Sequence, residues 1–379
     1  MFYLRKINLS VLLVLLTGIF CNCFAADPWK VLQKVQDVSK TILAVTQQDI
    51  AVPETYSCVC EIKGDLSGKI KEITGGTEDV LIKKYYKQHG NVCNITLHSE
   101  TKAGQPYESA ELKMALNPLT LMLKKITAAE RLNAIAGITF IANFEIDKLK
   151  ELYDTRPEKV MLNNMKVNKL TLTNRYAGAM ERSYIKEWII WVCKKNLLRK
   201  MYIVKVIKSK TGEQIKEDTI VSDSEYVYSK HGKYNLPVEV FQPQENMKTT
   251  INYEPRDNYY LVSAMDFYRA GEQESSMSFT YKQYEGYFMP VKVLVSGKEK
   301  VKISCDYTKV LDYFLPGYES LEFESHAPVE IKYFEYSLER PVIEDAMADV
   351  SRETVDDWRI SIEDFYEQTY TAIRDDEQR

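Results

Sequence analysis

The spacing of hydrophobic positions changes several times along this chain. Near the start, apolar residues recur at steps of three and four, the spacing of one stripe on an α-helix. The stripe consists of Val31, Val35, Val38, Ile42 and Val45. Asp27-Pro28 precedes it, and proline in the first turn of a helix loses no backbone hydrogen bond. The pattern predicts an amphipathic helix that ends before Pro53.

After Pro53 the spacing shortens to two. Tyr56, Cys58, Cys60 and Ile62 alternate with polar or smaller residues, which is typical of a strand with one buried face. Glycines at 64, 68 and 75–76 predict turns between short strands, and two further strands are expected over 80–87 and 91–101.

The helical spacing returns at Asn117-Pro118, where asparagine suits an N-cap and proline the first helical position. A helix is therefore expected from there to about Ala136. A shorter helix is expected over 147–153, before Arg156-Pro157.

From residue 160 to about 307 nearly every segment alternates like a strand, with turn residues such as Lys195-Asn196 between the segments. Successive strands without intervening helices predict an antiparallel meander. The stretches 235–240 and 288–293 are similar, each with a proline at its third position, which is compatible with a duplicated unit. Beyond Leu315-Pro316-Gly317 the alternation weakens.

The fold class predicted from these patterns is mainly β. We expect a curved antiparallel sheet, or half-barrel, with helices packed on or closing its concave face. Residues 26–245 form the main unit. Residues 246–342 add antiparallel strands that either continue the sheet or form a second unit, and 343–379 form an acidic, partly helical tail.

The first 25 residues have the features of a secretory signal peptide. Arg5 and Lys6 precede an apolar run from Val11 to Phe20, and small residues at Cys23 and Ala25 suit the cleavage site. A transmembrane helix needs about 20 apolar residues, which neither this run nor any later segment supplies. The expected location is the periplasm, with no transmembrane span in the mature chain.

The charge of the chain is near neutral as a whole but unevenly distributed. The chain carries a formal net charge of −4, so bulk charge does not favour a nucleic-acid partner. The acidic residues concentrate after Glu344, which marks the C-terminal tail as a separate segment.

Removal of the signal peptide leaves five cysteines: Cys58, Cys60, Cys93, Cys193 and Cys305. An odd number leaves at least one thiol without an internal partner. A disulfide from Cys93 to Cys58 or Cys60 would suit an oxidising compartment. The alternative, which the sequence favours, is that the buried thiols act as small hydrophobic groups.

The sequence lacks the common catalytic motifs, including a nucleophile elbow, a phosphate-binding loop, His-Glu-x-x-His and Cys-x-x-Cys. Its four histidines are far apart in sequence, and no second Cys-x-Cys or histidine pair completes a metal site. We therefore expect no enzyme activity, no cofactor and no metal.

A curved sheet closed by apolar helices would enclose a cavity suited to an acyl chain. The same apolar residues could instead pack on one another and leave no cavity. Trp188 and Ile190 share one face of their strand, and Ile189 and Trp191 share the other. The residues expected to line the cavity are Leu119, Met122, Leu123, Ile126, Trp188, Ile190 and Val192.

Four stretches in order resemble the LolA-like superfamily of periplasmic outer-membrane lipoprotein carriers and lipoprotein-sorting proteins. They are the helix 29–46 with the strand 56–62, the start Asn117-Pro118-Leu119, the strand–turn–strand around Trp188 and Leu198, and Lys210-Thr211-Gly212 leading to Asn235-Leu236-Pro237 and Phe241-x-Pro243. The family's gating arginine has no counterpart in Lys83-Lys84-Tyr85-Tyr86-Lys87, so no gating residue is transferred.

The resemblance implies a half-barrel with a helical lid that holds lipid without chemistry. The expected function is a periplasmic carrier that binds lipid acyl chains or lipoproteins. The alternative is a sensing protein or interaction scaffold of the cell envelope, with another envelope protein as its partner.

Overall fold

The computed structural model describes residues 27–339, except 49, 52, 77–78, 90–91, 108, 131–135, 178–183, 212–213, 298–299 and 325–326. The expected signal peptide (1–25) and acidic tail (343–379) lie outside these residues. So do the side chains of Met122 and Ile126.

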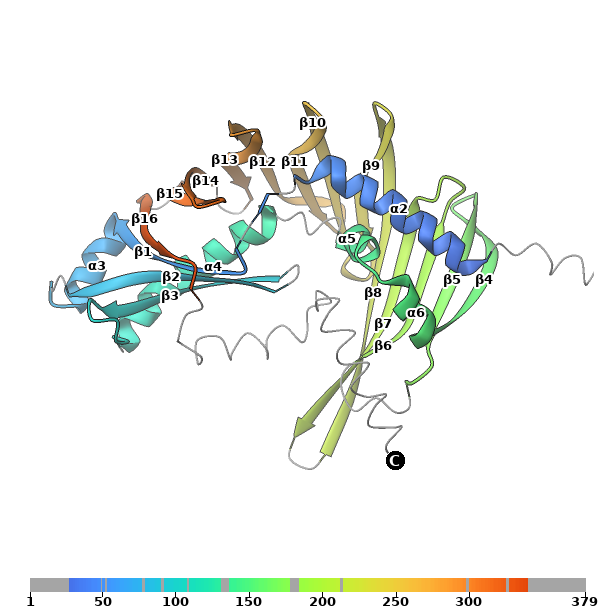
Figure 1. Ribbon diagram of the computed structural model, residues 1–379, viewed down its shortest axis with the longest axis horizontal. Helices are drawn as coiled ribbons and strands as arrows, with labels where there is room; N and C mark the ends of the chain where they lie inside the picture. Colours follow the sequence, from blue (N-terminus) through green and yellow to red (C-terminus); the bar gives the residue numbers. More distant parts are fainter. Residues whose placement is uncertain are drawn as a thin grey trace, which may run out of the picture.

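The described chain folds around one antiparallel sheet of sixteen strands that curves into an arch (Figure 1). Thirteen strands form a continuous meander: β4 (Tyr153–Leu162), β5 (Met165–Asn174), β6 (Tyr184–Val192), β7 (Leu198–Thr211), β8 (Gln214–His231), β9 (Tyr234–Gln242), β10 (Met247–Arg256), β11 (Tyr259–Arg269), β12 (Glu272–Tyr284), β13 (Tyr287–Ser296), β14 (Val301–Val310), β15 (Tyr313–Phe323) and β16 (Val329–Ser337). The strands after Gln242 thus continue the same sheet. The predicted mainly β, curved antiparallel fold is confirmed.

Three N-terminal strands extend the far end of the meander: β1 (Thr55–Lys63), β2 (Val80–His89) and β3 (Val92–Thr101). β1 pairs with β16, so the first and last strands of the described chain are neighbours. β2 separates β1 from β3. Because adjacent strands lie about 4.8 Å apart, Cys93 on β3 is about 10 Å from β1, beyond the reach of a disulfide to Cys58 or Cys60. Cys58 and Cys60 are buried free thiols.

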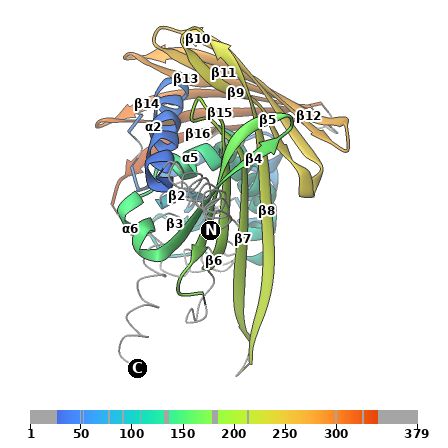
Figure 2. The same cartoon turned by 90° about the vertical axis from the view of Figure 1, so that its right-hand side faces the viewer.

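Five helices complete the described fold: α2 (Pro28–Thr46), α3 (Asp65–Ile73), α4 (Ala110–Glu130), α5 (Ala136–Ala142) and α6 (Ile146–Leu152). α2 and α4 lie inside the curve of the sheet (Figure 1), and α2 crosses near strands β4, β9 and β11. α4 packs against β3 and α3. The second view shows β7 and β8 as the longest hairpin, reaching well beyond the helices (Figure 2).

α2 forms as its apolar stripe predicts. The Asp27 carboxylate accepts a hydrogen bond from the Trp29 N–H at 3.0 Å and caps the helix, and Pro28 occupies the first turn. Val35 is fully buried, and Leu32 nearly so, against α5 and the sheet.

Two expectations about the elements were wrong. The segment at Gly64 and Gly68 forms α3 rather than turns, because Leu66, Ile70 and Ile73 pack against the core at helical spacing. α4 begins at Ala110, not at Asn117. The Ser109 hydroxyl accepts from the Leu112 N–H at 3.2 Å, and burial of Leu112 supports the earlier turns. Where the alternation weakens after Pro316, the chain still continues β15 and then forms β16, within the region expected to add strands.

Four alternate hairpins of the meander, β8–β9, β10–β11, β12–β13 and β14–β15, repeat one local design. In each, a tyrosine stands beside a bulge and pairs with the residue nine positions later. The pairs are Tyr228–Pro237, Tyr253–Val262, Tyr281–Pro290 and Tyr307–Pro316. Four positions after each tyrosine the backbone takes a positive φ, at Gly232, Asp257, Glu285 and Leu311. The two similar stretches seen in the sequence belong to the first and third hairpins.

Tyrosine hydroxyl groups join successive hairpins. Tyr253 donates to the Pro237 carbonyl at 2.8 Å, Tyr281 to Val262 at 2.9 Å and Tyr307 to Pro290 at 3.0 Å. Tyr336 on β16 donates in the same way to Pro316. Each bond satisfies a carbonyl next to a bulge, where regular strand pairing is interrupted.

Replacing Tyr281 by phenylalanine removes one of these bonds and leaves the Val262 carbonyl without that donor. We expect the free energy of unfolding in urea to fall by about 1 kcal/mol. Tyr287→Phe, at an exposed hairpin tip, is the matched control and should change it little. An equal loss in both variants would contradict a structural role for the hydroxyl groups.

Candidate functional site

The candidate site is the face of the sheet that packs against α2, α4, α5 and α6, called here the helix-covered face. Cross-strand pairing places its buried side chains in one surface that runs through most of the strands. Representative members are Leu170, Ile190, Met201, Tyr226, Val240, Ile251, Met265, Val293, Ile303, Ile331 and Tyr333. They belong to a single cluster of buried residues that also includes the helix residues.

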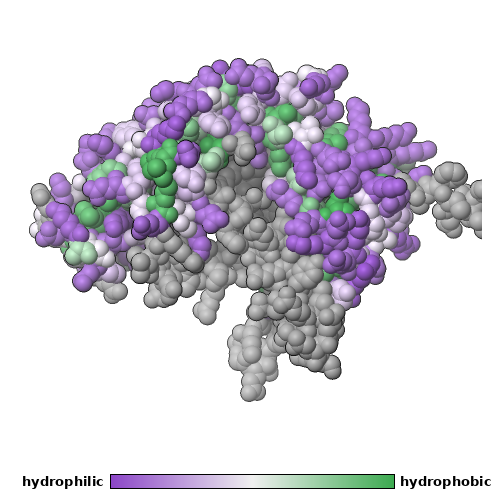
Figure 3. All heavy atoms as spheres, in the orientation of Figure 1, coloured by the Kyte–Doolittle hydropathy of each residue, from purple (hydrophilic) through white to green (hydrophobic). Residues whose placement is uncertain are grey.

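The space-filling view shows this arrangement from the side of the arch (Figure 3). Hydrophilic residues dominate the outside, and hydrophobic residues show in patches along the inner edge of the arch. In this view the outside of the arch is therefore mainly polar.

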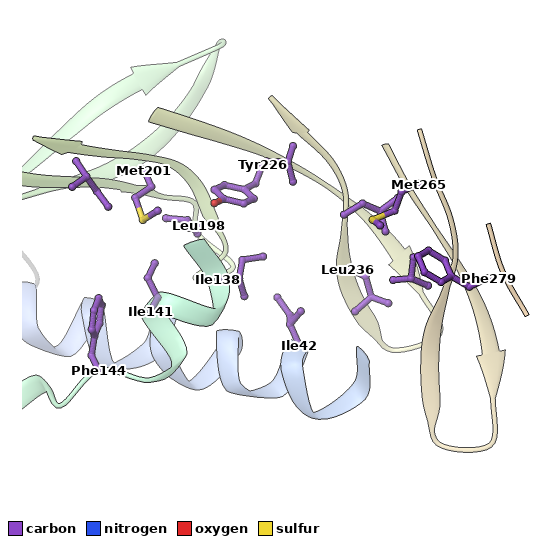
Figure 4. Close-up of a cluster of buried hydrophobic side chains, with 14 of the residues drawn as sticks. Ile42, Ile138, Ile141, Phe144, Leu198, Met201, Tyr226, Leu236, Met265 and Phe279 are labelled. Atoms are coloured by element: carbon purple, nitrogen blue, oxygen red, sulfur yellow. The ribbon is translucent and has the colours of Figure 1, made fainter. Parts of the chain in front are cut away.

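α5 lies between α2 and the sheet (Figure 4). Ile138 and Ile141 on α5 are fully buried, and Met201 and Tyr226 lie on the sheet side. At Gly137, an added Cβ would lie only 2.1 Å from the Tyr226 hydroxyl, so the close approach of α5 to β8 requires a glycine.

Two glutamines attach α2 to its surroundings. The Gln36 side-chain amide donates to the Phe144 carbonyl at 2.5 Å, just beyond the end of α5. Gln48 exchanges two hydrogen bonds of 2.7 Å with the backbone of Phe288 at the start of β13. These bonds satisfy carbonyl and N–H groups that lie outside regular pairing.

The structure settles which face of β6 is turned inward. Trp188, Ile190 and Val192 are buried on the helix-covered face, and Trp188 contacts the rings of Phe140 and Phe144 edge-on. Trp191 faces the other way, between the ammonium groups of Lys169 and Lys200. The Trp188 indole N–H has no hydrogen-bond partner within the described residues.

Leu119 and Leu123 are also buried, but on α4, which packs against β3. The ring contacts of Trp188 are with Phe140 on α5 and Phe144 just after it. The predicted residues thus belong to one apolar surface but to two different parts of it.

Sequence patterns did not reveal a buried polar cluster on the same surface. Lys84 on β2 and Glu319 on β15 are almost completely buried, with Lys84 Nζ 3.8 Å from Glu319 Oε1. Tyr333 on β16 donates a hydrogen bond to Glu319, and its ring centroid lies 4.4 Å from the Lys84 ammonium. Cys58 and Cys60 on β1 lie between these strands.

The electrostatics of this cluster keep Lys84 charged. Burial by itself lowers the pKa of the Lys84 ammonium, but the Glu319 carboxylate and nearby groups raise it, and the net shift is upward. Burial raises the pKa of Tyr56, Cys60 and Tyr333. The cluster thus holds one ammonium among protonated thiol and phenol groups, which suits hydrogen-bond donation rather than nucleophilic attack.

Two other kinds of feature, metal sites and membrane-spanning helices, were expected to be absent from the mature chain. No group of metal-binding side chains comes together within the described residues. None of the described helices is both long and apolar enough to span a bilayer.

Comparisons with known proteins add little. The sequence matches no family model and no curated protein. A solved structure described as a porin-like protein from Bacteroides uniformis ATCC 8492 is 6% identical, over 47% of this chain and 94% of that one, with a TM-score of 0.17. A similarity this low supports no conclusion about fold or function.

Proposed function

We propose that this protein is a periplasmic carrier that shelters lipid acyl chains, free or as part of lipoproteins, against its helix-covered face. The observation that supports this most directly is the continuity of that face across a single curved sheet. Each CH₂ group moved from water onto such a surface contributes about 0.8 kcal/mol to binding.

The covering layer also suits a carrier. It consists of separate helices, and side-chain hydrogen bonds from Gln36 and Gln48 help to hold α2 in place. Displacing such helices would open apolar surface without breaking strand pairing. The order of elements resembles that of LolA-like carriers, and the proposal extends their mode of lipid binding to this chain.

A fluorescent acyl probe, 11-(dansylamino)undecanoic acid, tests the proposal with the mature protein. We expect saturable binding with a blue-shifted emission, and energy transfer from Trp188 that falls in Trp188→Phe. Trp191→Phe, on the opposite face, is the matched control and should retain most of the transfer. Absence of saturable binding, both of this probe and of an uncharged acyl ester, would refute the carrier function.

A second candidate, an interaction scaffold of the cell envelope, is favoured by Leu311. This residue is 74% exposed at the tip of the β14–β15 hairpin and has a φ of 55°. A leucine is unfavourable on both counts, since it exposes apolar area and strains the backbone.

Leu311→Asn should therefore raise the free energy of unfolding by about 0.5–1 kcal/mol, because asparagine tolerates this conformation. Under the scaffold hypothesis it should also reduce cross-linking to envelope proteins in cells, with acyl-probe binding unchanged. Unchanged cross-linking would count against a role for this tip.

A further inference from the structure

The ion pair of Lys84 and Glu319 interrupts an apolar surface at a place where the repeated hairpins otherwise keep it apolar. Twelve positions after the bulge tyrosine, the first three hairpins have Val240, Met265 and Val293, all buried. The fourth has Glu319, equally buried. Departures from a local rule are expected at functional sites.

Lys84 meets Glu319 across two intervening strands, β1 and β16. Both charges are thus removed from water where the N-terminal strands β1–β3 join the end of the meander at β16. A buried ion pair of this kind commonly stabilises a fold less than well-packed apolar residues would, so stability alone does not explain it.

The ammonium of Lys84 can donate more hydrogen bonds than it donates within the described residues. It has three N–H donors, yet its ion pair with Glu319 Oε1 is 3.8 Å long, and its other polar contact is with the face of the Tyr333 ring. No hydrogen bond within the described residues involves Lys84 Nζ. The Tyr333 hydroxyl, in contrast, is committed to Glu319.

We propose that Lys84 donates a hydrogen bond to the carbonyl oxygen of an uncharged acyl group, an ester or amide, whose chain lies along the helix-covered face. This inference rests on the proposed carrier function. Such a site would orient the ligand, because a few placed polar groups in an apolar surface fix which end of a ligand goes where.

The pairing with Glu319 selects an uncharged acceptor over a free fatty-acid anion. Glu319 already neutralises Lys84, and a second carboxylate would lie close to the first and be repelled. No group of metal-binding side chains forms around the neighbouring Cys58, Cys60 and Cys305 within the described residues, so no further cation site stands there to offset this repulsion.

The test measures displacement of the dansyl probe by three ligands of matched chain length: methyl laurate, laurate and tridecane. We expect the wild type to bind the ester about tenfold more tightly than the hydrocarbon, the size of one hydrogen bond from a charged donor. Laurate should bind more weakly than the ester.

Two variants test whether Lys84 and Glu319 cause the preference for the ester. In the double variant Lys84→Met with Glu319→Val, which restores the residue type of the other hairpins, the ester should lose its advantage over tridecane while tridecane binding stays. In Glu319→Gln, which keeps the shape of the side chain, laurate should bind at least tenfold more tightly than in the wild type. Lys83→Met is the control, since Lys83 pairs with Glu100 instead and should leave all three affinities unchanged.

The outcomes separate the two hypotheses. If the wild type binds none of the three ligands, the carrier function fails and this inference fails with it. If the wild type binds the ligands without preferring the ester, or the double variant keeps the preference, Lys84 is not the anchor and the carrier function stands. Unchanged laurate affinity in Glu319→Gln would also overturn the inference, even if the double variant did not fold.

Discussion

Replacing Lys84 alone by methionine should destabilise the protein by about 3–5 kcal/mol. The substitution leaves Glu319 buried without its cation, and an uncompensated buried charge is far more costly than the loss of a contact. Urea unfolding of the mature protein measures the effect. Because an unpaired carboxylate can take up a proton, the loss should be smaller at pH 5 than at pH 8.

The double variant with Glu319→Val should recover most of that stability, and could exceed the wild type, because both charges leave the interior. The two substitutions are therefore strongly non-additive. Additive losses would show that Lys84 and Glu319 do not form a pair in the folded protein. Lys332→Met, which removes an exposed lysine from the opposite face of the neighbouring strand β16, should cost about 1 kcal/mol or less.

The pH dependence of the pair follows from the raised pKa of Lys84. A basic group with a raised pKa stabilises the fold fully below its ordinary value of 10.5 and loses this contribution only as the pH rises beyond it. The difference in stability between the wild type and the double variant should therefore stay constant from pH 6 to 9.

The local patterns of the sequence were sufficient for the elements of the meander. Strand alternation and turn residues predicted the series from β5 to β14, and the stripe from Val31 to Val45 predicted α2. These elements depend on neighbours in the chain, which a sequence shows directly. Gly64 and Gly68 by themselves predict turns, but α3 forms there because Leu66, Ile70 and Ile73 have helical spacing.

The pairing of β1 with β16 could not be predicted in this way. It joins residues more than 250 positions apart, and no local pattern specifies such a partner. For the same reason, the sequence does not predict the polar cluster, whose members lie on strands far apart in the chain. Lys84 stands between Ile82 and Tyr86 on a buried strand face, and this position signals a buried lysine, but its partner Glu319 is defined only by the strand order.

The apolar part of the candidate site was easier to predict. Trp188, Ile190 and Val192 alternate along one strand, and one such face had to be buried. Which face it was depended on the placement of α5, because Phe140 and Phe144 cover Trp188 rather than Trp191. Alternation gives two faces, and only tertiary packing distinguishes them.

The second large effect on stability is expected at Gly64, which follows β1 and lies beside the start of β16. Its backbone has a φ of 96° and a ψ of −165°, a conformation accessible almost only to glycine. A Cβ at this position would lie 2.4 Å from the Pro328 carbonyl oxygen, just before β16. Gly64→Ala should lower the free energy of unfolding by about 3 kcal/mol or more, since neither the backbone nor the carbonyl can move without disturbing the pairing of β1 with β16.

Gly68, four residues further along, provides a matched control, because its replacement should change the free energy of unfolding in the opposite direction. It lies inside α3, and a Cβ there would meet nothing within 4 Å. Gly68→Ala should therefore stabilise the protein by about 0.5–1 kcal/mol, because alanine reduces the freedom of the unfolded chain and favours the helix. Urea unfolding of both variants distinguishes the two sites. Equal and small effects would mean that the end of β1 does not pass close to Pro328, and the pairing of β1 with β16 would have to be revised.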